Sequence, residues 1–253
     1  MTKNIPIKTL FATLLFSAFL SSLSASATET VAEEHLSAEK EKITATIRQI
    51  KSYTAALTTF RDTFNAIPGD MSRAQVRLPH CNAVLCPALP GNGNGRIGDS
   101  TARKIELFKD ERHLFWVQLA NSSLIGGVDN TLSAERAWGS AFPSSPLGGG
   151  FQIYDGDDSQ FPAASEYAPK ANGVYAILSN SLNGDLSEPD AHFLTPIQAA
   201  QLDRRIDDGQ PLTGSIIAVG DPVCFTHRNG VFQYDEEGAG DKKCLSLYIR
   251  LQG

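Results

Sequence analysis

Two loops of the sequence combine oxygen-bearing side chains with glycine at spacings that suit calcium. In the first loop Asn92 and Asn94 offer amide oxygens at alternate positions, and a glycine follows each of them. The first and last ligand positions of such a loop would be Pro90 and Thr101, which supply no carboxylate. The second loop carries three acids that could share a calcium ion, Asp155, Asp157 and Asp158. The alternative, which we favour, is a turn rich in left-handed conformations for the first loop and a solvated turn for the second.

A serine nucleophile is the other chemistry that a motif suggests. Gly98-Asp99-Ser100 resembles the nucleophile block of one class of hydrolases, whose serine also needs a histidine three residues after an aspartate. His192 follows Asp190 by two residues, and His227 has Cys224 at the required position. The sequence therefore predicts a protein that is not an enzyme, and a hydrolase built on Ser100 is the weakest hypothesis.

The charge balance excludes a further class of function. The chain of 253 residues has 22 lysines and arginines against 28 aspartates and glutamates, which gives a net charge of −6. A nucleic-acid-binding protein needs a basic surface that displaces counterions from phosphates. We therefore expect no nucleic-acid partner.

The first 27 residues have the features of a secretory signal peptide. Two lysines give a positively charged start, residues 9–23 are largely apolar, and Ala25-Ser26-Ala27 has the small residues that signal peptidase requires. The apolar stretch is short for a membrane span, and an uncleaved anchor is the alternative. Cleavage before Thr28 would leave residues 28–253 as one globular domain, periplasmic or secreted, with no stable membrane insertion.

Four cysteines would remain after this cleavage, and sequence distance pairs Cys81 with Cys86 and Cys224 with Cys244. An even number of cysteines in an exported chain is typical of disulfide bonds. A zinc site is the alternative, but no two cysteines have C-x-x-C spacing and only His80 lies beside one. We therefore expect two local disulfides and no cofactor.

Helical periodicity is strongest in residues 32–65, where apolar residues recur every three or four positions until Pro68-Gly69-Asp70 ends the pattern. A second helix is expected over residues 102–121, which would place His113 on its surface or at the edge of the core. Such a long first helix needs a sheet or a partner along its length.

The last third of the chain predicts one helix among short strands. Thr195, Pro196 and Gln198 form a capping-box pattern for a helix that ends at Asp208-Gly209. Strands are expected at residues 151–154, 174–178, 215–219, 223–227, 231–234 and 245–251, with a hairpin turn at Asn229-Gly230. A helix first and an antiparallel sheet last predict an α+β fold with loop-rich insertions.

Residues 43–251 resemble the globular part of type IV pilin-like and type II secretion pseudopilin-like proteins. The first matching motif comprises Ala45-Thr46-Ile47, Gln49-Ile50, Tyr53, Ala56, Phe60-Arg61-Asp62 and Pro68-Gly69-Asp70. Later matches, in the same order as in the family, are Leu114-Phe115-Trp116, Ala141-Phe142-Pro143, Leu147-Gly148-Gly149-Gly150, Leu194-Thr195-Pro196 and Ile206-Asp207-Asp208-Gly209. The resemblance implies a pilin-like fold, in which a long N-terminal helix packs on a small antiparallel sheet.

The resemblance also implies a structural or interaction role in the cell envelope. The family begins with a cleavage motif and an apolar half-helix that anchors the subunit, whereas residues 28–40 here include Glu29, Glu33, Glu34 and Glu39. Carboxylates at these positions are costly in lipid or in a dry filament core. We therefore expect an accessory whose partners are other pilus, secretion or envelope proteins. The alternative is a calcium-dependent or small-molecule binding module of the periplasm.

Overall fold

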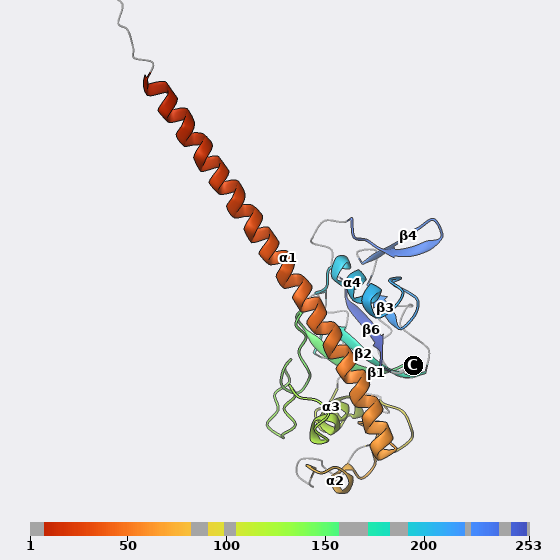
Figure 1. The fold of residues 1–253 in the computed structure, drawn as a ribbon. Coiled ribbons are helices and arrows are strands. Elements are labelled where there is room, and N and C mark those ends of the chain that lie inside the picture. Colours follow the sequence, from red (N-terminus) through yellow and green to blue (C-terminus); the bar gives the residue numbers. More distant parts are fainter. Residues whose placement is uncertain are drawn as a thin grey trace, which may run out of the picture. The chain divides into compact units, whose positions relative to one another are not determined.

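The computed structural model describes residues 8–81, 91–98, 105–156, 172–182, 192–220, 224–237 and 244–251, with side chains from residue 33 onward. The chain forms two compact units, Met1–Lys42 and Ile43–Gly253. The described part of the first unit, residues 8–42, is helical, and the second unit contains all of the described strands (Figure 1).

Four helices are described, α1 over Lys8–Phe64, α2 over Ala74–Arg77, α3 over Glu111–Asn121 and α4 over Pro196–Ile206. The first helix ends where the sequence predicts but begins well before residue 32, because the leader continues the helical conformation without a break. Within the described part of the chain, no helix has both the length and the apolar character needed to cross a membrane.

The described strands form two antiparallel sheets. The larger has the order β1-β2-β6-β3, with β1 over Gly150–Asp155, β2 over Val174–Ser179, β3 over Ile216–Val219 and β6 over Ser246–Arg250. The smaller is a hairpin of β4 over Phe225–Arg228 and β5 over Val231–Tyr234. Helices packed with small antiparallel sheets make the fold α+β, as the order of elements predicts (Figure 1).

The second unit is organised by the part of α1 that belongs to it, because this part carries an apolar stripe. Ile43, Ile50 and Leu57 are each at most 2% exposed and belong to the main core. The Tyr53 ring lies edge-on to Phe151 of β1 and to Trp116 of α3, at centroid distances of 5.4 and 4.9 Å. The stripe therefore packs against the inner face of the four-stranded sheet.

The opposite face of the same sheet carries a second, smaller cluster. Alternation along the strands places a separate set of side chains there. These are Tyr154, Tyr175, Ile177, Val219 and Tyr248. The sheet is therefore buried on both faces.

The start of α3 corrects the predicted second helix. Residues 105–110 form turns, and the helix begins at Glu111 with Asp110 as its N-cap. The Asp110 carboxylate accepts hydrogen bonds from the Arg112 backbone amide and guanidinium, and both side chains are 2% exposed. This buried ion pair fixes the start of the helix at Glu111. The periodicity of apolar residues, on which the prediction was based, does not reveal this position.

His113 is fully buried, so its predicted place at the surface or core edge is wrong. Its Nδ1 atom accepts a 3.0 Å hydrogen bond from the Phe108 amide, and its ring lies edge-on to Phe108 and Phe142. Burial, opposed by the Asp110 charge, lowers the pKa of His113 to about 4. The imidazole is therefore a neutral part of the core at physiological pH.

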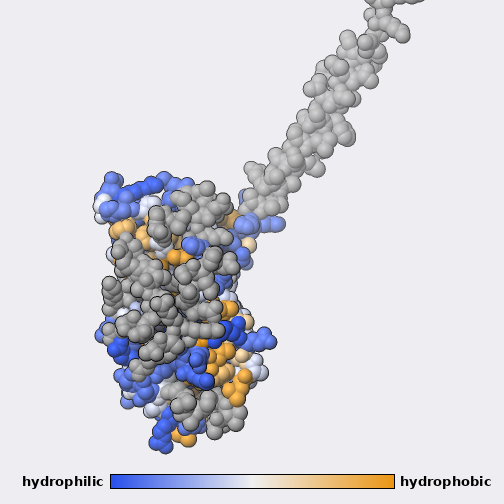
Figure 2. Space-filling model, turned by 180° about the vertical axis from the view of Figure 1, so that it is seen from behind, coloured by the Kyte–Doolittle hydropathy of each residue, from blue (hydrophilic) through white to orange (hydrophobic). Residues whose placement is uncertain are grey.

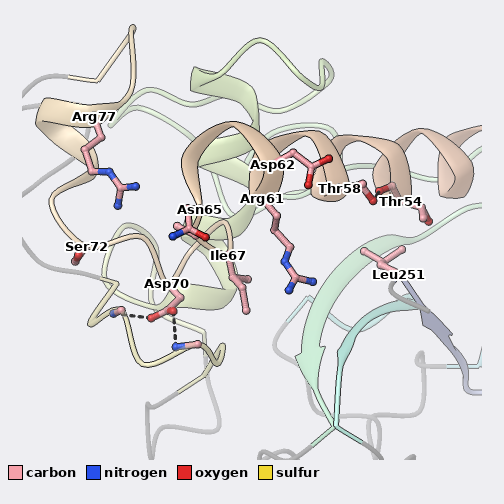
Figure 3. A pocket seen from close by; sticks show the side chains of 13 residues that line it. Thr54, Thr58, Arg61, Asp62, Asn65, Ile67, Asp70, Ser72, Arg77 and Leu251 are labelled. Atoms are coloured by element: carbon pink, nitrogen blue, oxygen red, sulfur yellow. Dashed lines mark hydrogen bonds between the residues drawn. The ribbon is translucent and has the colours of Figure 1, made fainter.

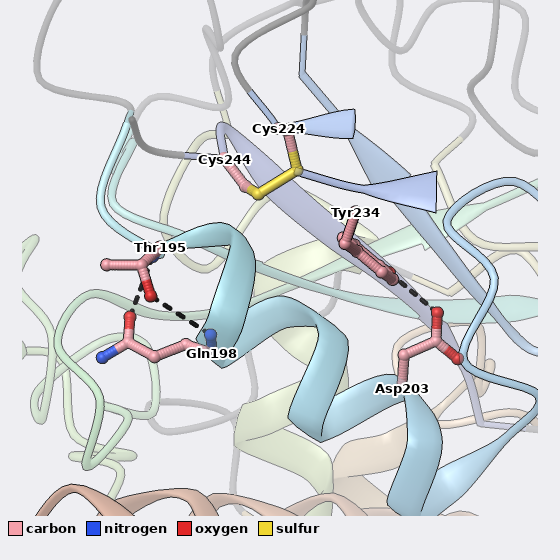
Figure 4. Close-up of a disulfide and its surroundings, with 6 residues drawn as sticks. All are labelled: Thr195, Gln198, Asp203, Cys224, Tyr234 and Cys244. Atoms are coloured by element: carbon pink, nitrogen blue, oxygen red, sulfur yellow. Dashed lines mark hydrogen bonds between the residues drawn. A yellow bond between two sulfur atoms is a disulfide. The ribbon is translucent and has the colours of Figure 1, made fainter. Parts of the chain in front are cut away.

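The C-terminal elements follow their local sequence signals closely. Thr195 Oγ1 accepts from the Gln198 amide and Gln198 Oε1 accepts from the Thr195 amide, which confirms the capping box (Figure 4). Asn229 and Gly230 both have positive φ angles, 53° and 84°, as a tight hairpin turn requires. These elements are thus determined by short stretches of chain.

Candidate functional site

The loop of residues 91–98 is held by carboxylates from three other parts of the chain. Asp70, in the turn after α1, accepts hydrogen bonds from the amides of Gly93, Asn94 and Gly95 at 2.7, 3.1 and 2.8 Å. The Asp70 side chain is nearly buried, and these three donors balance its charge. The sequence analysis assigned Asp70 only to the end of the first helix, but its side chain holds the loop in place.

Two more acids complete this arrangement. Glu111, the first residue of α3, accepts from the amides of Asn92 and Gly98 at 3.3 and 3.1 Å. Asp155, at the end of β1, accepts from the Ile97 amide at 3.0 Å. The loop therefore ties α1, α3 and β1 together through its own backbone.

The calcium candidates of the sequence take specific places in this arrangement. Asp155 belongs to β1 and is buried, so the predicted solvated turn is wrong at this residue. Its carboxylate accepts from the first loop, so part of the second candidate meets the first. The side-chain oxygens of Asn92 and Asn94 accept from the backbone amides two residues further on, at 2.9 Å each. Asp157 and Asp158 lie outside the described residues. Each described candidate side chain thus accepts a hydrogen bond from an amide of the chain.

A cavity of about 730 Å³ lies between this loop and the last turns of α1 (Figure 3). Its walls come from α1, the Asp70 turn, α2, the loop and the end of β6. The residues that matter most below are Thr54, Thr58, Arg61, Asp70, Arg77 and Leu251. This cavity is the candidate functional site of the second unit.

Two arginines enter the cavity from different elements. Arg61, in the last turn of α1, extends between Ile67 and Leu251 (Figure 3). Arg77 of α2 approaches from the other side, and its guanidinium donates to the Phe64 carbonyl at the end of α1. Basic groups suit this position because the carbonyls at a helix C-terminus carry partial negative charge.

Three other polar side chains of the cavity wall have hydrogen-bond partners within the chain. The hydroxyls of Thr54 and Thr58 donate to carbonyls one turn earlier in α1. Asp70 is satisfied by the loop amides described above. Among the described residues, the Arg61 guanidinium has no hydrogen-bond or ion-pair partner. Arg61 and Arg77 are therefore the cationic hydrogen-bond donors that the described wall of the cavity offers.

A second acidic group lies at the end of α4, where carboxylate oxygens of Asp203, Asp207 and Asp208 come within 4.8 Å of one another. Asp203 accepts from the Tyr234 hydroxyl and the Gly209 amide, Asp207 from the amides of Ser215 and Ile216, and Asp208 from Gln210 and Thr213. These bonds fasten the helix end to the loop that leads into β3. We therefore interpret this acidic group as a structural connection.

The cysteine pairing is confirmed for one of the two bonds. Cys224 and Cys244 form a disulfide with a Cα–Cα distance of 4.7 Å (Figure 4). It joins the start of the hairpin to the residue that pairs with Leu194, just before β6. Cys86 lies outside the described residues, so the Cys81–Cys86 bond stays a prediction. Ser100, the nucleophile of the hydrolase hypothesis, also lies outside them.

The molecular surface adds little that marks a site. On the face shown in Figure 2, hydrophobic side chains appear in more than one place among hydrophilic ones. In the second unit the large apolar side chains that are most exposed are Val76, Leu132, Ile197 and Val231, which come from different elements.

Sequence reasoning missed the partners of the glycine-asparagine loop. The signal that could have found one of them is Asp70, an acid in the predicted helix stop. Glu111 lay inside the helix predicted over residues 102–121, and only the observed start of α3 places it at a helix end. No protein-family model matches the chain, and no curated protein or solved structure matches it either.

Proposed function

We propose that the protein is an exported, non-enzymatic, pilin-like interaction protein, an accessory of a pilus or type II secretion-like assembly in the cell envelope. The observation that carries this proposal is the packing of residues 43–64 of α1 along one face of a small antiparallel sheet. The order of the sequence motifs from residue 45 to residue 209 supports the same assignment.

The use of the acids supports a binding role rather than catalysis. Asp70, Glu111 and Asp155 hold the loop of residues 91–98, and the acids after α4 hold the connection to β3. Groups that position backbone in this way rigidify a surface. A rigid, loop-rich surface suits recognition of another protein.

Export and assembly can be tested together in the native host. The chain with a C-terminal tag should be recovered from the periplasmic or culture fraction, and N-terminal sequencing should start at Thr28. Cross-linking in intact cells should join it to subunits of a pilus or secretion channel. An unrelated exported protein with the same tag is the control. Recovery from the cytoplasm, or cross-links no different from those of the control, would contradict the proposal.

A further inference from the structure

The cavity beside α1 has an excess of hydrogen-bond donors that the chain does not use. Arg61 has no partner among the described residues, and Arg77 uses its guanidinium for one bond to the Phe64 carbonyl. A guanidinium presents several N–H groups in a planar fork, so both arginines have donors left. These unused N–H groups could be satisfied by a hydrogen-bond acceptor from a ligand.

The acids of the wall do not fill this role. Asp70 is only 3% exposed, and three loop amides saturate it. Asp62 also lines the cavity, but no ion pair joins it to Arg61 (Figure 3). Arg61 and Arg77 thus line one cavity, and neither forms an ion pair with Asp62 or Asp70, the two acids of its described wall. Acidic residues outnumber basic ones in this chain, 28 to 22.

The chemistry of an arginine fork selects the acceptor. A carboxylate matches the spacing of two parallel guanidinium N–H groups and forms short, charge-assisted bonds. The threonine hydroxyls of the wall already donate to α1 carbonyls, and the arginines are the charged donors of the wall. An arginine fork therefore favours an oxyanion, and the carboxylate is the oxyanion that unmodified protein side chains supply.

The other residues of the wall indicate whether such a carboxylate belongs to a small molecule or to a partner protein. Small-molecule sites are lined mainly by apolar and aromatic side chains that bury the ligand. Here the described lining contains no aromatic side chain, and its larger apolar members are Ile67 and Leu251. Polar surroundings with exposed arginine are typical of protein interfaces, where arginine is a frequent anchor.

We propose that this cavity binds an aspartate or glutamate side chain of a partner protein, with Arg61 as the main anchor and Arg77 as the second. The inference rests on the proposed function, because it names the chemistry of the partner that such an accessory would contact.

Binding can be measured with a fluorescein-labelled hexaglutamate peptide and the full exported chain. We expect saturable binding that weakens with added salt, since the contact is between charges. The Arg61→Gln variant should weaken it about tenfold, the size of one lost charge-assisted pair. Arg48→Gln, which removes an exposed arginine of α1 outside the cavity, is the matched control and should change the affinity less than about twofold.

Two further measurements keep the test decisive. Arg61→Lys retains the charge without the fork and should bind more weakly than wild type. The Arg61 Nε–H resonance of the wild-type protein should shift during the titration, which needs no variant to fold. Hexaglutamine is the uncharged control peptide.

Several results would overturn the inference. These are no binding of hexaglutamate at millimolar concentration, equal losses in Arg61→Gln and Arg48→Gln, or equal binding of hexaglutamine. Displacement by succinate at the same concentration as hexaglutamate would show a site for free carboxylates and refute a protein partner. If hexaglutamate fails while envelope cross-links persist, only this inference fails; if the chain is not exported, the proposed function fails whatever the peptide does.

Discussion

The Tyr234 hydroxyl donates a 2.7 Å hydrogen bond to the Asp203 carboxylate, and this bond joins the β4–β5 hairpin to α4 (Figure 4). Asp203 is fully buried, and the carboxylates of Asp207 and Asp208 lie close to it. Burial first, and these two like charges in addition, raise the pKa of Asp203 to about 6. The hairpin is thus fastened through a carboxyl group that gains a proton in mildly acidic solution.

The first prediction concerns Asp203→Asn. A carboxyl group whose pKa is higher in the folded state stabilises the fold below its unfolded pKa of about 4, and that contribution disappears as the pH rises through about 6. This effect should lower the unfolding free energy of the wild type by roughly 1–2 kcal/mol between pH 4 and 7. The variant should not show this decline, because an asparagine side chain cannot titrate. Urea unfolding of both proteins at four pH values measures the difference. Asp62→Asn is the control, and an unchanged slope in Asp203→Asn would show that Asp203 does not titrate here.

His113 should give the opposite pH dependence. Its pKa is lowered to about 4, so the neutral ring stabilises the fold above the unfolded pKa of about 6.5, and this contribution is lost as the pH falls through 4. In His113→Asn, the amide oxygen of the asparagine can still accept from the Phe108 amide. Because this side chain does not titrate, the variant should lose less unfolding free energy on acidification than the wild type. The same urea series tests this, with the exposed His227→Asn as control. Identical acid sensitivity in wild type and His113→Asn would contradict the prediction.

The stripe of α1 should dominate the stability of the second unit. Leu57 is fully buried, and its replacement by alanine should lower the unfolding free energy by about 2–5 kcal/mol. Leu36 is 55% exposed, so Leu36→Ala should change it by less than about 0.5 kcal/mol. Chemical denaturation of both variants gives the comparison, and equal effects would mean that the stripe does not pack on the sheet.

The loop of residues 91–98 should depend on Asp70. Asp70→Ala removes the acceptor of three amides, which should cost about 1–3 kcal/mol. Hydrogen–deuterium exchange should show faster exchange at Gly93, Asn94 and Gly95, whereas Asp129→Asn should leave these amides unchanged. Protection that persists in Asp70→Ala would assign the order of the loop to other contacts.

The second disulfide can be checked directly. Peptide mapping under non-reducing conditions should recover Cys81 linked to Cys86, because the two cysteines are close in sequence and the other two already pair. A free thiol at Cys81, or a peptide that links Cys81 to Cys224, would refute the pairing.

The sequence revealed those features whose causes lie within a few residues. The capping box of Thr195 and Gln198 and the turn at Asn229-Gly230 are local, and both are confirmed. The Cys224–Cys244 bond was predicted from spacing and is confirmed, and it joins the residue before β4 to a residue just before β6. These cases needed no knowledge of tertiary contacts.

The features that the sequence could not show depend on distant contacts. Asp70 meets the loop amides across more than 20 residues, and Asp155 meets Ile97 across 58. His113 is buried because Phe108 and Phe142 close around it, which helical periodicity does not encode. The cavity likewise exists only where α1, α2 and the loop converge.

The Cys224–Cys244 bond also has a mechanical consequence, because it encloses the β4–β5 hairpin in a covalent ring. A pulling force along the chain passes through the sulfur bridge and bypasses the residues between the two cysteines. Their sequence separation of 20 residues corresponds to about 70 Å of extended chain. The oxidised protein should therefore stretch about 70 Å less than the reduced one before it is taut. The hairpin should therefore keep its shape when the strands around it are pulled apart.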